Sequence, residues 1–425
     1  MLYRESSYED VLQGDKLFVI PIPNNWKDHY LDASICAMYI SNGVQDTIVP
    51  FDMVDEINVG KNYITFKDKV VYTSDKKLLE THWAVNSYDI NTAKWLDGCE
   101  NNVTMPDDYR ALLRLYTYED VNRYISPLKH LEYCRAFKDI FPSTDVLGLD
   151  FYQNTVYPGL RFLEKSGIVV DGELYREAFG KLESVDVLKT DYNLHTLTGR
   201  PSNSFNGVNF SALKKDSLQR QCIKSRFEKG KLYEFDFDAY HVRLIGRLLD
   251  YSFKEDSVHA EFGKEYFHTD TLSDEEYQQS KQITFKNMYS TVDSRYSNQF
   301  FIKVDELKEY VWNSYKKSKY LQSPISKRAI AKNSKEKMYK SKAFNYFIQA
   351  IETDFSMIVI YRLKELLKNY KSKFMLYTYD SFLFDVHPDE DGILPRELYN
   401  CLTKNKMHVK THSGENYNHM KNYQL

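Results

Sequence analysis

The sequence has few cysteines, and they form no pattern. None of the five lies in a CxxC pair or in a Cys/His cluster. Scattered thiols, odd in number, argue against both a disulfide framework and a structural zinc site. We therefore expect free thiols at all five positions, which are Cys36, Cys99, Cys134, Cys222 and Cys401.

Long apolar runs and a large excess of one charge are also absent. No run reaches the roughly 18 apolar residues that a membrane helix requires. The start MLYRESSYED lacks the basic-then-apolar pattern of a signal peptide. We therefore expect a cytoplasmic protein with no membrane partner. The net charge of −3 excludes a general polyanion binder, so any surface for nucleic acid must be local.

The chain is long enough for two or three packed domains, since 42% of its 425 residues are hydrophobic. Residues 151–171 predict a helix that ends near Gly167 and forms a junction between domains. Beyond it, strands alternate with helices, including a long helix from about Phe344 to Tyr370, so we predict the α+β class. The first hundred residues contain short β-type runs between turn residues, at 17–23, 34–40, 46–52 and 62–72.

A basic run lies between Lys316 and Lys342, where ten lysine and arginine residues are opposed only by Glu336. One interpretation is a solvated, lysine-rich face. The other is a track that contacts nucleic-acid phosphates. Composition alone does not separate the two.

Two aspartates stand where strands are predicted to end. Asp236 follows a period-two strand, just before the pattern becomes helical, and Asp380 lies at the tip of a predicted hairpin within 373–386. Neighbouring strands that each present a carboxylate can hold two Mg²⁺ ions for phosphoryl transfer. The alternative is that both are simple turn acids.

A predicted helix between the two aspartates carries one cation and two aromatic rings on a single stripe. It starts at a capping box formed by Ser273 and Glu276. Lys281, Phe285 and Tyr289 then follow at intervals of four residues, so the ammonium could meet a triphosphate and the rings a sugar and base. The alternative is an amphipathic helix that buries both rings.

The long helix near the C-terminus presents Asn345, Gln349 and Glu352 on one face. Two amides one turn apart suit hydrogen bonds to the base or sugar edges of a duplex. A polar outer face is the alternative.

Taken in chain order, these segments resemble the family A DNA polymerases, the group of DNA polymerase I, over most of residues 146–425. Asn345, Gln349 and Asp354 keep the family's N-x3-Q-x4-D spacing. The other matching segments are HTLTGRPSNSFNGVNF (195–210), DFDAYHVR (236–243, motif A), DSVHAEFGKEYF (256–267), SKQITFKNMYS (280–290, motif B), Tyr379-Asp380-Ser381 (motif C) and HSGENYNHM (412–420).

The resemblance implies primer extension from deoxynucleoside triphosphates on primer-template DNA, with release of pyrophosphate. It implies that Asp236, Asp380 and the Phe237 carbonyl hold two Mg²⁺ ions, or Mn²⁺, and that Lys281 assists the departing pyrophosphate. The nucleotide contacts that it implies come from Lys281, His259, Phe285, Tyr289 and His241. Together with the basic run, it implies nucleic-acid contacts from Arg200, Asn209, Arg243, Lys327, Arg328, Asn345, Gln349 and Tyr379.

The sequence departs from the family pattern around this set. His241 replaces the motif A glutamate that screens out ribose, and Tyr277 replaces the arginine one turn before the motif B lysine. Motif C usually reads His-Asp-Glu, so Tyr379 and Ser381 change a primer contact and an accessory acid. Neither of the two motif C changes touches a direct metal ligand.

The resemblance also implies a domain order. It predicts a degenerate exonuclease-like α/β domain (1–145), a junction with a reduced thumb (146–198), palm (199–252), fingers with the basic connector (253–343), and palm again (344–425). Fewer than thirty residues separate Asp171 from Thr198, where a long helical thumb is usual, so we expect poor processivity without a partner protein. The compact form and the AT-rich composition suggest a phage enzyme in a bacterial host.

The N-terminal region lacks the paired acids of a proofreading nuclease. No Asp-x-Glu pair lies on its first strands, Asp89 in VNSYDI is a lone carboxylate, and 132–141 lacks the usual Tyr-x3-Asp spacing. We expect no proofreading. Two other functions stay open: a single-subunit RNA polymerase, against which Phe285 argues, and a catalytically decayed nucleic-acid-binding protein, against which the retained Asp236, Lys281 and Asp380 argue.

Overall fold

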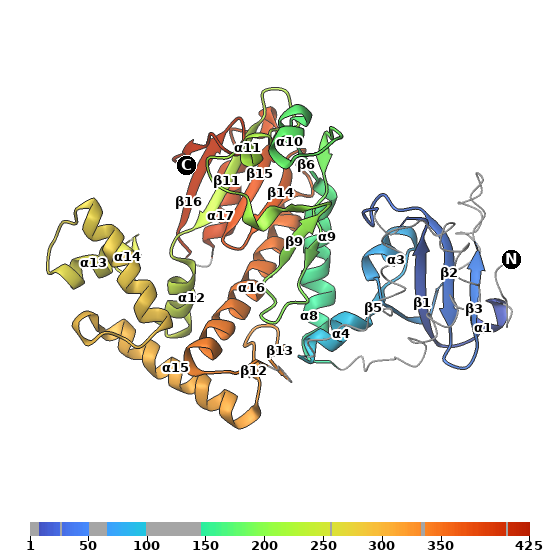
Figure 1. Cartoon of the computed structure of the whole chain (residues 1–425), viewed down its shortest axis with the longest axis horizontal. Helices are drawn as coiled ribbons and strands as arrows, with labels where there is room; N and C mark the ends of the chain where they lie inside the picture. The colour runs from blue at the N-terminus through green and yellow to red at the C-terminus, as the bar shows by residue number, and fades with distance from the viewer. Residues whose placement is uncertain are drawn as a thin grey trace. The chain divides into compact units, whose positions relative to one another are not determined.

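The computed structural model forms two compact units, residues 1–149 and 150–425 (Figure 1). Cys99, Cys134, Asp256 and the segment 132–141 lie outside the described residues, whereas Cys36, Cys222 and Cys401 are free thiols. The structure describes residues 8–25, 28–50, 66–98, 146–255, 257–332, 336–404 and 407–425.

The first unit is built on a five-stranded mixed sheet in the order β3-β2-β1-β4-β5. β1 pairs antiparallel with β2 and parallel with β4. Nearly every residue of β1 and β2 is buried, so both faces of the sheet are covered. Its described elements are α1 (Tyr8–Val11), β1 (Lys16–Pro23), β2 (Ile35–Ser41), β3 (Asp46–Pro50), β4 (Val70–Thr73), α3 (Lys76–His82), β5 (Ser87–Asp89) and α4 (Ile90–Leu96).

Three of the four predicted strands of this unit are confirmed, and the fourth is partly wrong. The run 62–72 was expected to be one strand, but β4 begins only at Val70. Asp68 has a φ of 60°, which places a turn immediately before the strand. Residues 62–65 of that run lie outside the described part of the chain.

The second unit is built on a five-stranded antiparallel sheet in the order β14-β15-β11-β16-β17. β11 is central and pairs with β15 on one side and β16 on the other, which aligns Asp236 with Ser381. Phe235 and Phe237 are buried, whereas Glu234 and Asp236 alternate with them toward the other face. The strands are β11 (Lys231–Phe237), β14 (Lys373–Thr378), β15 (Ser381–Val386), β16 (Val409–Gly414) and β17 (Lys421–Asn422).

The long helix α16 (Lys340–Leu367) packs beside this sheet and contacts helices from several parts of the unit. Its buried side chains share a core with α13, α14 and α15, which extend together to one side of the sheet (Figure 1). None of the described helices, α16 included, is long and apolar enough to cross a membrane. The packed helices are α9 (Tyr157–Ser166), α12 (Tyr240–Leu248), α13 (Val258–Phe267), α14 (Asp274–Tyr289), α15 (Gln299–Ser318) and α17 (Leu394–Thr403).

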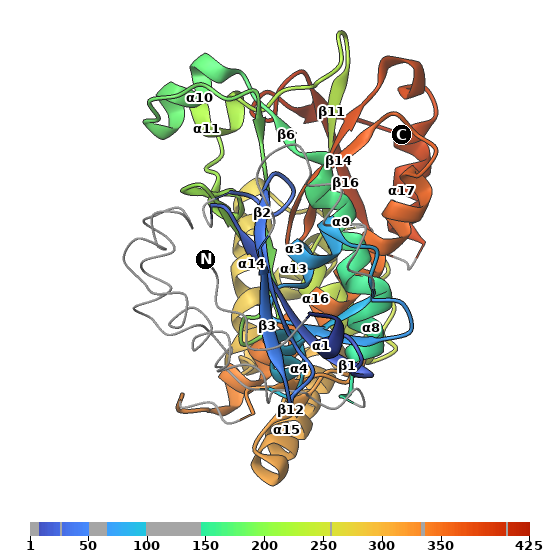
Figure 2. The same cartoon turned by 90° about the vertical axis from the view of Figure 1, so that its right-hand side faces the viewer.

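The segment in which the resemblance predicts a reduced thumb holds only short elements. Between Asp171 and Thr198 the structure has one helix of eight residues, α10 (Gly172–Phe179), and two short strands. α10 contacts α11 at one end of the unit (Figures 1 and 2). The remaining elements of the second unit are α8 (Leu149–Phe151), η1 (Tyr152–Val156), β6 (Ile168–Val169), β7 (Val187–Leu188), β8 (Tyr192–Asn193), β9 (Ser202–Phe205), β10 (Val208–Asn209), η2 (Phe210–Ala212), α11 (Leu218–Gln221), η3 (Ser294–Tyr296), β12 (Leu321–Gln322), β13 (Ala329–Ile330) and η4 (Pro388–Glu390).

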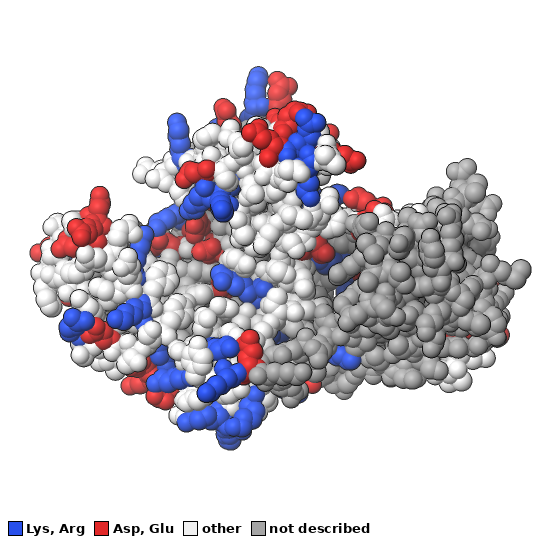
Figure 3. All heavy atoms as spheres, in the orientation of Figure 1, with Lys and Arg blue, Asp and Glu red and all other residues white. Residues whose placement is uncertain are grey.

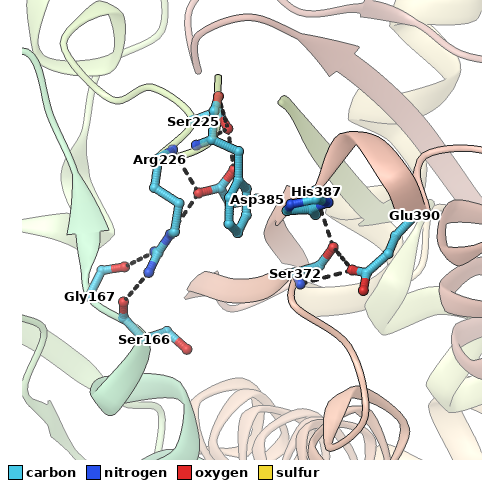
Figure 4. A network of polar contacts seen from close by, with 9 residues as sticks. Ser166, Gly167, Ser225, Arg226, Ser372, Asp385, His387 and Glu390 are labelled. Carbon is cyan, nitrogen blue, oxygen red and sulfur yellow. Dashed lines mark hydrogen bonds and ion pairs between the residues drawn. The ribbon is translucent and has the colours of Figure 1, made fainter. Parts of the chain in front are cut away.

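A buried ion pair joins the central sheet to the end of α9 (Figure 4). Asp385 on β15 is fully buried, and its Oδ2 accepts from the Nε of Arg226 at 2.8 Å and from the backbone N–H of Arg226 at 3.0 Å. The other two guanidinium nitrogens donate to the carbonyls of Ser166 and Gly167, each at 2.9 Å. The Asp385 carboxylate and all three guanidinium nitrogens of Arg226 therefore have hydrogen-bond partners, as a buried ion pair requires.

Candidate functional site

A cavity of about 380 Å³ opens where β11, the β14–β15 turn, α13, α14 and α16 meet. It is lined by both polar and aromatic side chains, including residues that lie far apart in the sequence. Eight of the site residues predicted from the sequence line it: Arg200, Asp236, Phe237, His241, His259, Lys281, Phe285 and Asp380.

Asp236 on β11 and Asp380 in the neighbouring β14–β15 turn both line this cavity. Asp236 is the last but one residue of β11, and Asp380 stands in the turn between β14 and β15. The N–H of Phe237 donates to the Asp380 carbonyl at 2.9 Å, which fixes the two strand ends together. Tyr379 has a φ of 62°, so a left-handed residue forms the tight turn that carries Asp380.

The electrostatics of the pair are those of crowded, partly buried acids. Burial, and then the charges of Asp380 and Glu234, raise the pKa of Asp236 to about 7. Burial also raises the pKa of Asp380, and the nearby Glu352 adds to the effect. Two hard oxygen donors that repel each other are a donor set that a divalent cation would stabilise, with the Phe237 carbonyl as a further oxygen. Within the described residues no group of three or more His, Cys, Asp or Glu side chains could hold a metal ion.

The helix α14 forms the opposite wall. Its capping box is present as predicted, with Ser273 and Glu276 bonded reciprocally. The Lys281 ammonium lies 4.7 Å from the ring centroid of Tyr277, one helical turn earlier, so the aromatic ring contacts the cation. Tyr277 is the residue that replaces the arginine of the family pattern. Phe285 is 48% exposed, which excludes the alternative that this helix buries the ring.

His259 on α13 faces the same wall with an unused nitrogen. Its side chain is 4% exposed, and its Nδ1 has no hydrogen-bond partner among the described residues. Burial lowers the pKa of this imidazole to about 4. The Ser280 hydroxyl donates to the His259 carbonyl and joins α13 to α14. A buried polar atom without a partner at a cavity wall is a place where a polar ligand group would be stabilised.

A chain of contacts crosses the cavity from α14 to the β14–β15 turn. Tyr289 contacts the Nδ1 of His241, and the Nε2 of His241 lies 2.6 Å from Oε2 of Glu352. Oε1 of Glu352 lies 3.5 Å from Nη2 of Arg200, whose guanidinium carbon stacks 3.8 Å from the centroid of the Tyr379 ring. His241 and Arg200 thus meet at the Glu352 carboxylate, and each of them contacts a tyrosine from a further segment.

An acidic side chain contacts the residue at two positions where the sequence departs from the polymerase pattern. His241 stands where the resemblance has glutamate, and it contacts Glu352 of α16. Ser381 stands where motif C has glutamate, and its hydroxyl donates to Glu234 of β11 at 2.9 Å. The hydroxyl of Tyr417 donates to the same Glu234 oxygen at 2.9 Å. The acidity missing from each motif is therefore present on a neighbouring element.

The residues predicted to contact nucleic acid are spread more widely. Asn209 and Lys327 are exposed outside the cavity, and Asn209 caps η2 by accepting from Ser211 N. Gln349 donates to Asn345 at 3.2 Å, so the two amides lie side by side on α16. The basic run is not one continuous face: exposed lysines gather over the C-terminal end of α15 (Figure 3), and they are Lys316, Lys317 and Lys319.

Arg328 requires a correction. We expected this residue to contact nucleic acid, but its side chain is 1% exposed. Its Nη2 donates to the Thr198 carbonyl at 2.6 Å, and the charge of Asp354 opposes the burial that lowers its pKa to about 10. Arg328 therefore holds the loop that carries Arg200 and cannot reach a phosphate. Arg243 is also buried, 8% exposed, with its Nε donating to the Asp238 carbonyl, so it too offers no surface to nucleic acid.

Three charged residues of the cavity were not identified as site residues from the sequence. Glu352 was assigned only to a polar face, although the acid stands between Ile351 and Thr353 in a largely apolar helix, which is a signal of a buried acid. Asp238 is 6% exposed and pairs with Lys410, and both line the cavity. Their pairing follows from β11 and β16 lying side by side, which no local pattern predicts.

In the first unit, Asp89 has a structural role. Its carboxylate accepts from the backbone N–H groups of Asn91 and Thr92 at the start of α4, and from that of Lys76. Burial raises the pKa of Asp89 against these hydrogen bonds. The carboxylate is thus occupied as a helix cap.

No family model and no curated protein matches this sequence. Among solved structures, the chain is similar to the POL domain of Pol1 from M. smegmatis in complex with DNA primer-template and dNTP, with a TM-score of 0.68. The match covers 96% of this chain and 97% of that chain at 13% sequence identity. It confirms the predicted α+β fold as that of a DNA polymerase domain, with palm and fingers.

Proposed function

We propose that this chain is a template-directed DNA polymerase that adds deoxynucleotides to a primer 3′ end. The observation that carries the proposal is that one cavity is lined by Asp236 on β11, by Asp380 in the β14–β15 turn, and by Lys281 and Phe285 on α14. Acids, a cation and an aromatic ring in one pocket suit a metal-bound triphosphate joined to a sugar and base. The similarity to a polymerase domain supports the same conclusion.

Different residues of the cavity would bind the cations, the phosphates and the rest of the nucleotide. Asp236, Asp380 and the Phe237 carbonyl would hold divalent cations, which we take to be two Mg²⁺ ions, with Mn²⁺ as a substitute; when bound, they supply charge stabilisation to the attacking and leaving oxygens. Lys281 would neutralise charge on the departing pyrophosphate. The free Nδ1 of His259 is available to a phosphate oxygen. The remaining nucleotide contacts that we propose are Phe285, Tyr289 and His241.

Primer and template contacts are proposed at the cavity's outer side. Arg200 and Tyr379 stack on each other beside Asp380, which suits a primer terminus. The paired amides of Asn345 and Gln349 offer donors to the duplex minor groove. Lys327 and Asn209 are exposed for backbone contacts.

Magnesium affinity is expected to depend on pH through Asp236. Because burial and neighbouring charge raise its pKa to about 7, the carboxyl is protonated in more acidic solution and must release a proton to bind the cation. The affinity should therefore fall about tenfold per pH unit below pH 7 and level off above it. Calorimetric titration of the full chain with MgCl₂ between pH 5.5 and 8.5 measures this. An affinity that is flat with pH would contradict the assignment of Asp236 as a ligand.

Primer extension tests the proposed function directly. The purified chain is given a primed DNA template with Mg²⁺ and either dNTPs or NTPs, and products are separated by length. We expect extension with dNTPs in the order that the template specifies. Extension with NTPs at equal efficiency would favour a single-subunit RNA polymerase, and no extension with either would favour a nucleic-acid-binding protein without catalysis.

The same assay addresses processivity and proofreading. We propose that the chain releases DNA after few additions, because α10 is the only helix between Asp171 and Thr198, and that a partner protein compensates for the reduced thumb. We also propose that a mismatched primer is not shortened, because Asp89 serves as a helix cap. Long products from the chain alone would contradict the proposal of low processivity. Shortening of the mismatched primer would contradict the proposal that the chain does not proofread.

A further inference from the structure

Glu352 is a buried acid in the cavity wall that the proposed chemistry does not use. Its side chain is 2% exposed, with Oε2 2.6 Å from Nε2 of His241 and Oε1 3.5 Å from Nη2 of Arg200. Replacing a buried ionic group by a well-packed apolar one is often neutral or stabilising. Stability alone therefore does not account for an acid at this position.

The contacts of Glu352 decide the state of the His241 ring. A carboxylate only accepts hydrogen bonds, so the Nε2 of His241 carries the hydrogen that points to Glu352. In the neutral ring Nδ1 is then an acceptor, and the Tyr289 hydroxyl donates to it. Both ring nitrogens are thus engaged, and the ring offers no free donor or acceptor to a ligand.

The position of this ring relative to a nucleotide follows from α14. Lys281, Phe285 and Tyr289 are spaced by four residues, which is about 6 Å per step along a helix. A triphosphate beside Lys281 and His259 would bring the sugar to Phe285, about one step further on. The next step ends at Tyr289, which contacts His241, and His241 and Glu352 both line the pocket.

We propose that Glu352 determines the sugar specificity of this pocket by holding His241. The inference rests on the proposed polymerase function, and it concerns how the pocket distinguishes deoxyribonucleotides from ribonucleotides. A ribose 2′-hydroxyl that meets this wall finds no hydrogen-bond partner, because both ring nitrogens are engaged, and would be buried unpaired. A deoxyribose has no 2′-hydroxyl and therefore leaves no polar group unpaired at this wall. Glu352 is a positioning residue, since it acts through His241.

Single-nucleotide incorporation opposite a template thymine tests the proposal. We measure kcat and KM for dATP and ATP with the full chain and with Glu352→Ala. Alanine leaves the Nε2 of His241 free and opens space beside it, so the preference for dATP should fall about tenfold or more, chiefly through a lower KM for ATP. Glu365→Ala, the same change at an exposed site on the same helix, is the matched control and should leave the preference unchanged.

Two further variants separate positioning from folding. Glu352→Gln keeps an oxygen that accepts from His241 and should retain most of the preference for dATP. Glu352→Asp keeps the charge near Arg200 but is too short to hold His241, and it should lose the preference while its thermal melting stays cooperative. A wild type that cannot use dATP would overturn the proposed function itself. A wild type that extends with dATP, beside folded Asp or Ala variants of unchanged preference, would overturn only the role of Glu352.

Discussion

Replacing Asp236 or Asp380 with asparagine is expected to reduce primer extension about a thousandfold or more, because each change removes a charged ligand from the proposed cation site. Asparagine has nearly the same shape as aspartate, so the fold should persist. Single-turnover incorporation with saturating dNTP and Mg²⁺ measures the loss. Asp270→Asn, the same change at an exposed position between α13 and α14, is the matched control and should retain full activity.

The Asp236→Asn variant should be less active than the wild type but more stable against unfolding in metal-free buffer. The raised pKa means that the folded protein favours the protonated carboxyl, so this group's contribution to stability is lost as the pH rises toward and through about 7. In metal-free buffer at pH 8, the variant should therefore be more stable than the wild type by about 1 to 2 kcal/mol, a discounted value because water partly screens the carboxylate. Equal activity in variant and wild type, or a variant that melts earlier, would contradict the assignment.

Arg226→Ala is expected to destabilise the second unit by about 3 to 5 kcal/mol, because it leaves the fully buried Asp385 without its cation. The carbonyls of Ser166 and Gly167 lose their donors in the same step. Urea unfolding followed by circular dichroism measures the loss. Hydrogen exchange of peptides from β15 and α9 assigns it to this unit, since these two elements are the ones that Arg226 joins (Figure 4).

Two comparisons test whether burial causes the effect. Arg176→Ala removes an exposed arginine from its pair with Glu173 and should cost less than about 1 kcal/mol. The double variant Arg226→Met with Asp385→Leu removes both charges and should recover part of the stability that the single variant loses. A single variant as stable as the wild type would show that the network of Asp385 contributes little.

Local sequence patterns predicted the elements that form this site. The switch from period two to helical spacing placed Asp236 near the end of β11, and the two β-rich runs located the turn that carries Asp380. The capping box located the start of α14. These features depend on neighbours within a few residues, which is the range over which a single sequence carries a clear signal.

Burial of polar groups could not be predicted in the same way. Arg328 belongs to a lysine-rich run and was expected to be exposed, yet carbonyls near Thr198 and the carboxylate of Asp354 surround it. Glu352 was expected on a polar face, yet it meets His241 and Arg200 inside the cavity. The contact partners Thr198 for Arg328, and His241 and Arg200 for Glu352, lie more than a hundred residues away in the sequence, so local periodicity does not identify them.

The central position of β11 limits how this site could change in evolution. The strand is paired on both sides, so inserting or deleting one residue would turn Asp236 away from the cavity and bring a phenylalanine into its place. Gradual change is then confined to substitutions that keep the length of the strand. Glu234 beside Ser381 and Glu352 beside His241 show that an acid on a neighbouring element can supply negative charge to the pocket. Searches for distant relatives should therefore compare the charge of the pocket as a whole, since a motif compared residue by residue would miss an acid supplied from a neighbouring element.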